Sequence, residues 1–183
     1  MDPAKDTRNL VDKYKGLSVE SIKESLGEQR VDLEIALENL TRDYNMGTIV
    51  RTANAFNVNK IHIIGSRQWN KRGAMKTDAY MDIEYHSTVA GFRETIKAKG
   101  GKILAVDIVE GALPIHSVEL PGNSVLVFGS EGPGLSGEML SAADEIVFIE
   151  QFGSTRSINV GVAAGMAMYE WVRQNVYKNT ATK

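Results

Sequence analysis

The stretch "SVLVFGSEGPGLSG", residues 124–137, leads from an apolar run into a loop that holds four glycines. "SVLVF" predicts a buried strand, and "SGEMLSAA" after the loop predicts a short helix. The alternation recurs along the chain, with strands expected in "KIHIIG" and "EIVFI" and helices in "TVAGFRETIKAKGG" and "SINVGVAAGMAMYEWVRQNVYK". Strands that alternate with helices predict an α/β fold with a mainly parallel sheet flanked by helices.

Two loops follow strands and precede helices in this pattern, namely residues 129–136 and "EQFGSTRS", residues 150–157. Ligands of such sheets bind beyond the carboxyl ends of the strands, so both loops are candidate binding loops. The first loop lacks the Lys-Ser/Thr ending of a P-loop and the pattern of a dinucleotide fingerprint. Its glycines exceed the needs of one tight turn, which remains the alternative, and would let main chain lie close to a flat ligand.

Composition sets further bounds on the 183-residue chain, whose hydrophobic content of 43% and charged content of 24% are those of a globular protein. No apolar run is long enough to span a bilayer, and no signal-peptide pattern opens the chain. The absence of cysteine excludes disulfides and cysteine nucleophiles and fits a cytoplasmic location. His62, His86 and His116 show no metal-ligand spacing, so we expect surface or strand histidines and no metal.

The first expected strand, "RVDLEIALEN" at residues 30–39, places apolar residues on one face and mostly acids on the other. Arg51 lies in an otherwise small or apolar helix, where a surface salt bridge is the simplest explanation. Ser157 is typical of a helix cap, whereas Asn159 in the first turn of an apolar helix is an amide that needs partners.

A net charge of -2 argues mildly against a nucleic-acid partner, because phosphate binding is mostly electrostatic. The segment "SRQWNKRGAMKT", residues 66–77, nevertheless carries several cations and one tryptophan without any acid. It is either a solvated loop or a phosphate-binding surface with an aromatic ring for stacking.

Three stretches together resemble the SpoU/TrmH-type RNA 2'-O-ribose methyltransferases of the SPOUT superfamily. They are "NMGTIVRTANAFNV" from residue 45, "VLVFGSEGPGLS" from residue 125 and "IEQFGSTRSINVGVAAGMAMYE" from residue 149. Glu150 departs from the family, which usually has proline there. The resemblance implies a deep trefoil knot at the carboxyl end, which general topology rules would not propose. It also divides the chain into an N-terminal helical extension (1–29), a methyltransferase domain (30–177) and a C-terminal tail (178–183).

The resemblance implies S-adenosylmethionine as cofactor and methyl transfer to a ribose 2'-hydroxyl. Expected cofactor contacts are Val106, Gly129, Ile149 and Ile158. The family assigns activation of the hydroxyl to the arginine at Arg51, which either takes the proton or only orients the hydroxyl and stabilises the emerging oxyanion. The expected supporting residues are Asn45, Glu131, Ser157 and Asn159. Glu131 would hold Arg51 or Asn45 by a charge-assisted hydrogen bond.

The expected partners are RNA and a second copy of the chain, with the active site near the dimer interface. Candidate RNA contacts are Arg67, Trp69, Lys71, Arg72 and Arg156. About thirty residues precede the first strand, too few for a separate RNA-binding domain, which favours tRNA over rRNA. The alternative functions are a knotted RNA-binding protein or assembly factor without turnover and, less favoured, a small-molecule nucleotide-binding domain.

Overall fold

The fold is built around a parallel sheet, as the alternation of strands and helices predicts. The structure is a computed structural model, and it describes residues 2–39 and 45–178. These residues form a seven-stranded sheet in the order β3-β2-β1-β6-β4-β7-β5, and each neighbouring pair is parallel. The strands are β1 (Val31–Asn39), β2 (Val58–Gly65), β3 (Ile83–His86), β4 (Lys102–Val106), β5 (Leu113–Pro114), β6 (Ser124–Phe128) and β7 (Glu145–Phe148).

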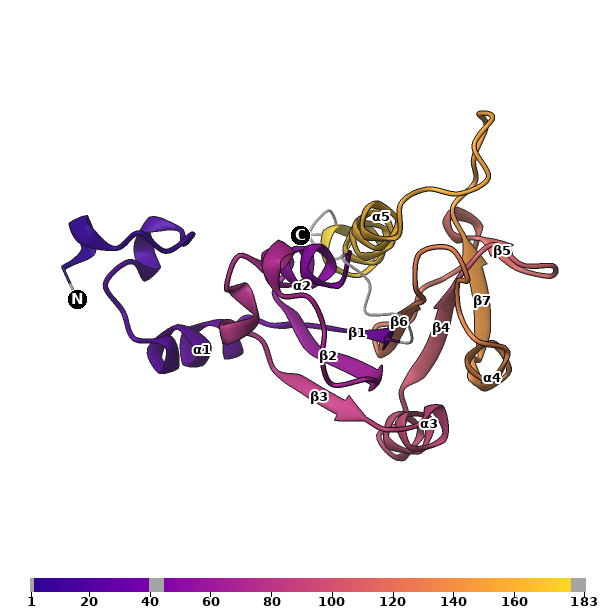
Figure 1. The fold of residues 1–183 in the computed structure, drawn as a ribbon, viewed down its shortest axis with the longest axis horizontal. Coiled ribbons are helices and arrows are strands. Elements are labelled where there is room, and N and C mark those ends of the chain that lie inside the picture. The colour runs from indigo at the N-terminus through magenta and orange to yellow at the C-terminus, as the bar shows by residue number, and fades with distance from the viewer. Residues whose placement is uncertain (1, 40–44, 179–183) are drawn as a thin grey trace.

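Helices cover both faces of this sheet. The α-helices are α1 (Val19–Gly27), α2 (Asn45–Ala55), α3 (Val89–Ala98), α4 (Gly137–Ala142) and α5 (Val160–Val172). Short turns of 3₁₀-helix are η1 (Pro3–Lys5), η2 (Asp12–Tyr14), η3 (Arg72–Ala74), η4 (Thr77–Tyr80) and η5 (Ile115–Ser117), and the π-helical η6 (Arg173–Tyr177) extends α5. Figure 1 shows α2 and α5 on one face, α3 and α4 on the other, and α1 beside the layers. None of the described helices combines the length and apolarity that a membrane crossing requires.

Strand β1 is buried on both faces from Leu33 onward, because α2 and α5 cover one face of the sheet and α3 and α4 cover the other. Leu33, Ile35 and Leu37 belong to the apolar cluster on the side of α2 and α5. The alternate residues Glu34 and Glu38 are only 8% and 4% exposed, so the acidic face of the strand is not a solvated one. Buried carboxylates need partners, and those of Glu34 and Glu38 are found on neighbouring elements.

The N-terminal segment, residues 2–28, is anchored to the domain by its own polar and apolar contacts. The Asp6 carboxylate accepts hydrogen bonds from the Arg8 guanidinium and from the Gly16 N–H at 2.9 Å. The Arg8 side chain, the largest cause, holds the pKa of Asp6 well below its usual range. Tyr14 and Ile22 pack with Tyr80 of η4 in a separate buried cluster. The segment is therefore a fixed wall beside α2 and η4.

Candidate active site

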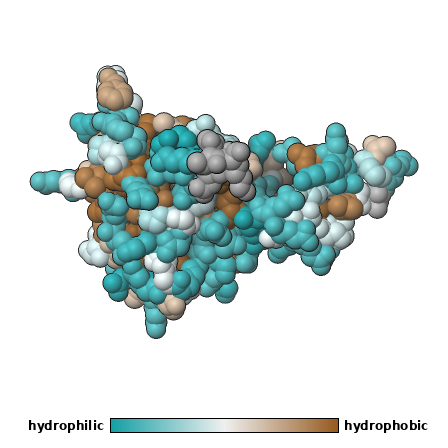
Figure 2. Space-filling view, turned by 180° about the vertical axis from the view of Figure 1, so that it is seen from behind, coloured by the Kyte–Doolittle hydropathy of each residue, from teal (hydrophilic) through white to brown (hydrophobic). Residues whose placement is uncertain are grey.

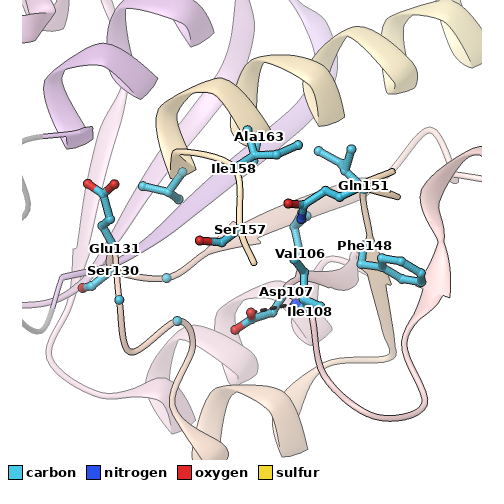
Figure 3. A pocket seen from close by; sticks show the side chains of 15 residues that line it. Val106, Asp107, Ile108, Ser130, Glu131, Phe148, Gln151, Ser157, Ile158 and Ala163 are labelled. Atoms are coloured by element: carbon cyan, nitrogen blue, oxygen red, sulfur yellow. Dashed lines mark hydrogen bonds between the residues drawn. The ribbon is translucent and has the colours of Figure 1, made fainter. Parts of the chain in front are cut away.

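A pocket opens where β4, β6 and β7 end, as expected for an α/β sheet. Its walls come from the two predicted binding loops and from the residues that follow β4. All four expected cofactor contacts line it, namely Val106, Gly129, Ile149 and Ile158. Figure 3 shows Gln151 next to Val106, and Ser157 on the side of the pocket that faces Glu131 and Ser130.

The glycines of the first loop are required mainly by its own tight folding. A Cβ on Gly129 would lie 2.3 Å from the carbonyl carbon and oxygen of Gly134. Gly132 and Gly134 have φ of +96° and +70°, which other residues rarely adopt. Ser130 and Gly134 exchange main-chain hydrogen bonds of 3.0 and 3.2 Å across the bend. Gly137 is different, because a Cβ there would meet nothing within 4 Å.

Asp107 ties this loop to the end of β4. Its carboxylate accepts hydrogen bonds from the N–H groups of Leu135, at 2.8 Å, and Ile108, at 2.7 Å. A Cβ on Gly134 would lie 2.5 Å from Asp107 Oδ2, so glycine is needed for this close approach. The pocket is thus bordered by main chain in a fixed conformation.

Gln151 gives the pocket an unused hydrogen-bond acceptor. Its Oε1 atom is buried and has no hydrogen-bond partner among the described residues. A buried oxygen without a donor is costly, by about 1–3 kcal/mol, unless a bound molecule supplies one. Val106, Ile108 and Phe148 provide apolar surface beside it. These residues suit a ligand that combines a flat apolar ring with a hydrogen-bond donor, and sequence reasoning did not single out Gln151.

Three polar residues from the three motifs meet at the rim of this pocket, and we call them the edge triad: Asn45, Glu131 and Asn159. Asn45 Nδ2 donates to Glu131 Oε2 at 2.6 Å, and Asn159 Nδ2 donates to Asn45 Oδ1 at 3.0 Å. Asn159 Nδ2 also lies 3.4 Å from Glu131 Oε1. Of the two partners expected for Glu131, these contacts show Asn45.

Helix packing brings the edge triad together. A Cβ on Gly161 would meet Thr48 Cγ2 at 3.4 Å and Asn45 Oδ1 at 3.6 Å, which are ordinary contact distances and show that the start of α5 lies directly against α2. The side chain of Asn159 caps α5 by accepting from the N–H groups of Gly161, at 3.0 Å, and Val162, at 3.3 Å. The expectation that Ser157 is the cap is therefore wrong, because Asn159 performs this role and Ser157 lines the pocket.

Arg51 is separated from the other expected catalytic residues. It is exposed on α2 and lines a second hollow, between α2 and the N-terminal segment, rather than the pocket at the strand ends. Among the described residues, no carboxylate forms a salt bridge with it. The simple surface salt bridge is thus not found in the described part of the chain.

The basic segment 66–77 is only partly available to a ligand. Trp69 is 9% exposed, belongs to the main apolar core, and its indole N–H donates to the Tyr85 hydroxyl at 3.5 Å. The prediction of Trp69 as a stacking surface is therefore wrong for this conformation. Lys71 forms a hydrogen bond of 2.8 Å with Asp78, which raises the pKa of the lysine. Arg67, another expected RNA contact, has its guanidinium 4.9 Å from the centre of the Tyr85 ring.

Arg72 and Arg156 remain exposed cations, and the structure shows no salt bridge to either among the residues it describes. Arg156 lies in the loop before α5, and Arg72 opens η3 beside α2. Both stay candidates for phosphate contacts.

A second group of polar residues was missed, and we call it the histidine cluster: Glu34, His62 and His86. His62 Nε2 lies 2.7 Å from Glu34 Oε2, and His62 Nδ1 lies 2.8 Å from His86 Nε2. Burial lowers the pKa of His86. Burial would raise the pKa of Glu34, but hydrogen bonds from His62 and Lys99 outweigh it and hold that pKa at about 2.

The two imidazoles of the histidine cluster, together with the neighbouring Glu84, have the donor atoms for a metal, since those of His62, His86 and Glu84 lie within 4.8 Å of one another. Lys60 pairs with Glu84 at 2.8 Å, and Lys99 pairs with Glu34. Two lysines thus balance the two carboxylates, and one hydrogen bond joins the two imidazoles. The cluster is complete as a structural network, so a metal is not needed to explain its burial.

Comparison with known proteins shows which family has these motifs. Residues 32–169 match the model of the SpoU rRNA Methylase family. The tRNA (guanosine(18)-2'-O)-methyltransferase of Escherichia coli K12 is 28% identical over 154 residues, which cover 82% of this chain and 67% of that protein. The 23S rRNA (guanosine-2'-O-)-methyltransferase RlmB of Acinetobacter baylyi is 31% identical over 153 residues, covering 79% of this chain and 60% of RlmB.

Solved structures give the same result. The TrmH/SpoU tRNA modifying enzyme of A. aeolicus superposes with a TM-score of 0.76 and 25% identity, covering 90% of this chain and 86% of that one. An AdoMet-bound rRNA methyltransferase of Sinorhizobium meliloti shares the fold, with a TM-score of 0.71 and 24% identity over 82% of this chain and 60% of that one. Because the family model spans β1 to α5, with the pocket and the edge triad, the chain belongs to the SpoU rRNA methylase family.

Proposed function

We propose that this protein transfers a methyl group from S-adenosylmethionine to a ribose 2'-hydroxyl of RNA, with tRNA as the preferred substrate. The observation that carries this proposal is the edge triad, which the three motifs assemble beside the pocket. The preference for tRNA is supported by the share of each relative's length that this chain matches. The matches span 67% and 81% of the tRNA enzymes of E. coli and Thermus thermophilus, but 60% and 65% of two RlmB enzymes.

The pocket suits this cofactor. S-adenosylmethionine, when bound, supplies an electrophilic methyl group on a sulfonium. Main-chain groups at Gly129, Ile149 and Ile158 would hold the adenosine part, with Val106 beside the ring. The unpartnered Gln151 Oε1 would accept a hydrogen bond from an amino group of the ligand.

The chain must supply the activation of the hydroxyl, which is a poor nucleophile while it keeps its proton. In our proposal the ribose oxygen bonds to the methyl carbon, the carbon–sulfur bond breaks with its electron pair left on sulfur, and the hydroxyl proton passes to solvent water. A guanidinium offers five N–H donors and no acceptor, so we assign Arg51, which is exposed on α2, to orienting the hydroxyl and stabilising its developing negative charge. The edge triad and Ser157 would position the sugar and the loop.

A homodimer would reconcile the separation of Arg51 from the pocket. Val162, Met166 and Tyr169 form an apolar stripe on α5 that is 45–54% exposed, and Phe152 is 94% exposed. Figure 2 shows further hydrophobic surface at the base of the projecting loop between β7 and α5. Helix α2, which carries Arg51, packs beside α5. We infer that two copies pair through this stripe and that Arg51 of one copy faces the pocket of the other.

The remaining architecture is also part of the proposal. A trefoil knot would involve both binding loops, and it is supported by the order β6-β4-β7, which inserts β7 beyond β4 before α5 returns to α2. We also propose the division into an extension (1–29), a methyltransferase domain (30–177) and a tail (178–183), and the family match over residues 32–169 supports the central part of it. A cytoplasmic location follows from the proposed RNA substrate.

The test combines calorimetry with S-adenosylmethionine and transfer of tritiated methyl to unmodified tRNA and rRNA. Arg51→Ala should abolish transfer while cofactor binding survives. Arg93→Ala, at an exposed arginine of α3 on the other face of the sheet, should preserve both. Wild-type protein that binds cofactor and RNA but transfers no methyl would favour the alternative of a binding protein without turnover.

A further inference from the structure

A second hollow, of about 650 Å³, lies between the N-terminal segment, α2 and η4. Its walls include Lys13 and Tyr14 of η2, Arg51 and Asn54 of α2, and Tyr80 of η4. We propose that this hollow binds a nucleotide of the RNA substrate next to the ribose that is methylated. The inference rests on the proposed function, because Arg51 is the residue that links the hollow to the reaction.

The walls of the hollow are held in place from both sides. Asp6 fixes the segment before α1 through Arg8 and Gly16, and Arg8 also donates to the Leu17 carbonyl at 2.8 Å. Asn57, which follows α2, donates from Nδ2 to the Leu26 carbonyl at 3.0 Å. A surface that is ordered before binding loses less conformational entropy when a ligand arrives.

The charges along the hollow suit an anion. Lys13 and Arg51 line it, and no aspartate or glutamate does. Among the described residues, no carboxylate forms a salt bridge with either cation, and the Lys13 ammonium lies 4.7 Å from the centre of the Tyr14 ring. Cations without acidic partners provide phosphate contacts, and these determine most of the affinity for nucleic acid.

The polar groups of the hollow suit the edge of a base. Asn54 Nδ2 lies 3.4 Å from the Met81 sulfur, which is a weak acceptor, and Asn54 Oδ1 has no partner among the described residues. Asn9, on the opposite wall, is also exposed. Carboxamides offer both a donor and an acceptor, as base edges do. Tyr14 and Tyr80 are 8% and 5% exposed, so recognition here depends on edges and phosphates rather than on stacking.

The experiment compares Lys13→Glu and Asn54→Asp with Lys23→Glu, a charge reversal at an exposed α1 residue that does not line the hollow. The measurements use the full chain and an unmodified tRNA transcript. They are the Kd at several salt concentrations, the KM and kcat for RNA, cofactor binding by calorimetry and the molar mass in solution.

We expect Lys13→Glu to weaken RNA binding about tenfold and to flatten the salt dependence by about 0.7–1 in log–log slope. Asn54→Asp should weaken binding about fivefold. In both variants the KM for RNA should change more than kcat, and cofactor affinity should stay within twofold of wild type. Lys23→Glu should match wild type in every measurement.

Two outcomes would overturn the inference. The first is that Lys13→Glu and Asn54→Asp bind RNA as Lys23→Glu does, while wild type still methylates RNA; the proposed function would then stand without this hollow. The second is that the two variants lose half their molar mass in solution, which would make the hollow a contact between subunits. If wild type transfers no methyl, the proposed function fails, but the binding comparison still tests the hollow.

Discussion

The edge triad and the histidine cluster are both polar networks of residues far apart in sequence, yet they differ in how completely they are enclosed. The edge triad lies at the strand ends beside an open pocket that contains an unpartnered acceptor on Gln151. The histidine cluster lies within the sheet, where His62 is 0% and His86 is 8% exposed. Its carboxylate Glu34 is paired with both an imidazole and an ammonium.

This difference separates a site that binds from a network that supports the fold. Polar groups that are satisfied and balanced by the protein itself contribute mainly to stability and to a unique core. Groups left open at a pocket keep their capacity for a ligand. Damage at the pocket should therefore reduce binding or turnover, and damage at the histidine cluster should reduce the free energy of unfolding.

The largest effect is expected from Gly129→Ala. The new Cβ would overlap main-chain atoms of Gly134 at 2.3 Å, so the loop must change conformation and the pocket wall with it. Calorimetry should detect no cofactor binding in this variant. Gly137→Ala, at the first residue of α4 directly after the loop and with open space for a Cβ, should bind cofactor like wild type. Equal binding by both variants would show that the loop conformation does not matter to the pocket.

The second prediction compares the loss of one carboxylate from each network. Glu34→Ala leaves His62 and Lys99 without their buried partner and should lower the free energy of unfolding by about 3 kcal/mol. Glu131→Ala, at an exposed position, should change stability by less than about 0.5 kcal/mol but lower kcat at least tenfold. Urea titration and single-turnover assays measure the two quantities. The contrast between the networks fails if Glu131→Ala is the less stable variant.

The sequence predicted the triad but not the cluster for a physical reason. Asn45, Glu131 and Asn159 stand in motifs with unusual composition, where glycine and amides interrupt apolar patterns. His62 and His86 stand in ordinary strands 24 residues apart, and only the parallel register of β2 and β3 places them together. Sequence periodicity indicates which side chains share one face of a strand, but it does not indicate which strand lies beside it in the sheet.

The same limit explains the other differences. Trp69 stands among cations in the sequence, but its burial and its hydrogen bond to Tyr85 depend on packing that no local pattern records. Strands β3 and β5 have four and two residues, too short for a recognisable period. The separation of Arg51 from the pocket depends on the packing of α2, which its own sequence does not specify.

A smaller effect is expected from Gln151→Met, which removes the unpartnered acceptor while keeping the length of the side chain. Loss of one hydrogen bond of about 1 kcal/mol should weaken cofactor binding about fivefold to tenfold. Stability should not fall, because Oε1 has no partner within the described chain to lose. Unchanged cofactor affinity would mean that Gln151 does not contact the ligand. The pocket would then offer no open hydrogen-bond acceptor at this residue and would resemble the histidine cluster in this respect.

The smallest expected effect is the change in the free energy of unfolding with pH, and it tests the histidine cluster. Burial lowers the pKa of His86 below its ordinary 6.5, so the unfolded chain binds this proton more readily than the folded chain does. The free energy of unfolding should therefore fall as pH drops below about 6.5 and level off below the folded pKa. Glu34, with a folded pKa of about 2, stabilises the fold fully above about pH 4.5 and loses this contribution only as pH falls from there toward 2, so the two pH windows are distinct. His86→Gln should flatten the dependence of the free energy of unfolding on pH between pH 7 and 5, as measured by urea titration at several pH values. An unchanged slope in His86→Gln would mean that this histidine takes up its proton without opening the network, so that the cluster is less closed than its geometry indicates.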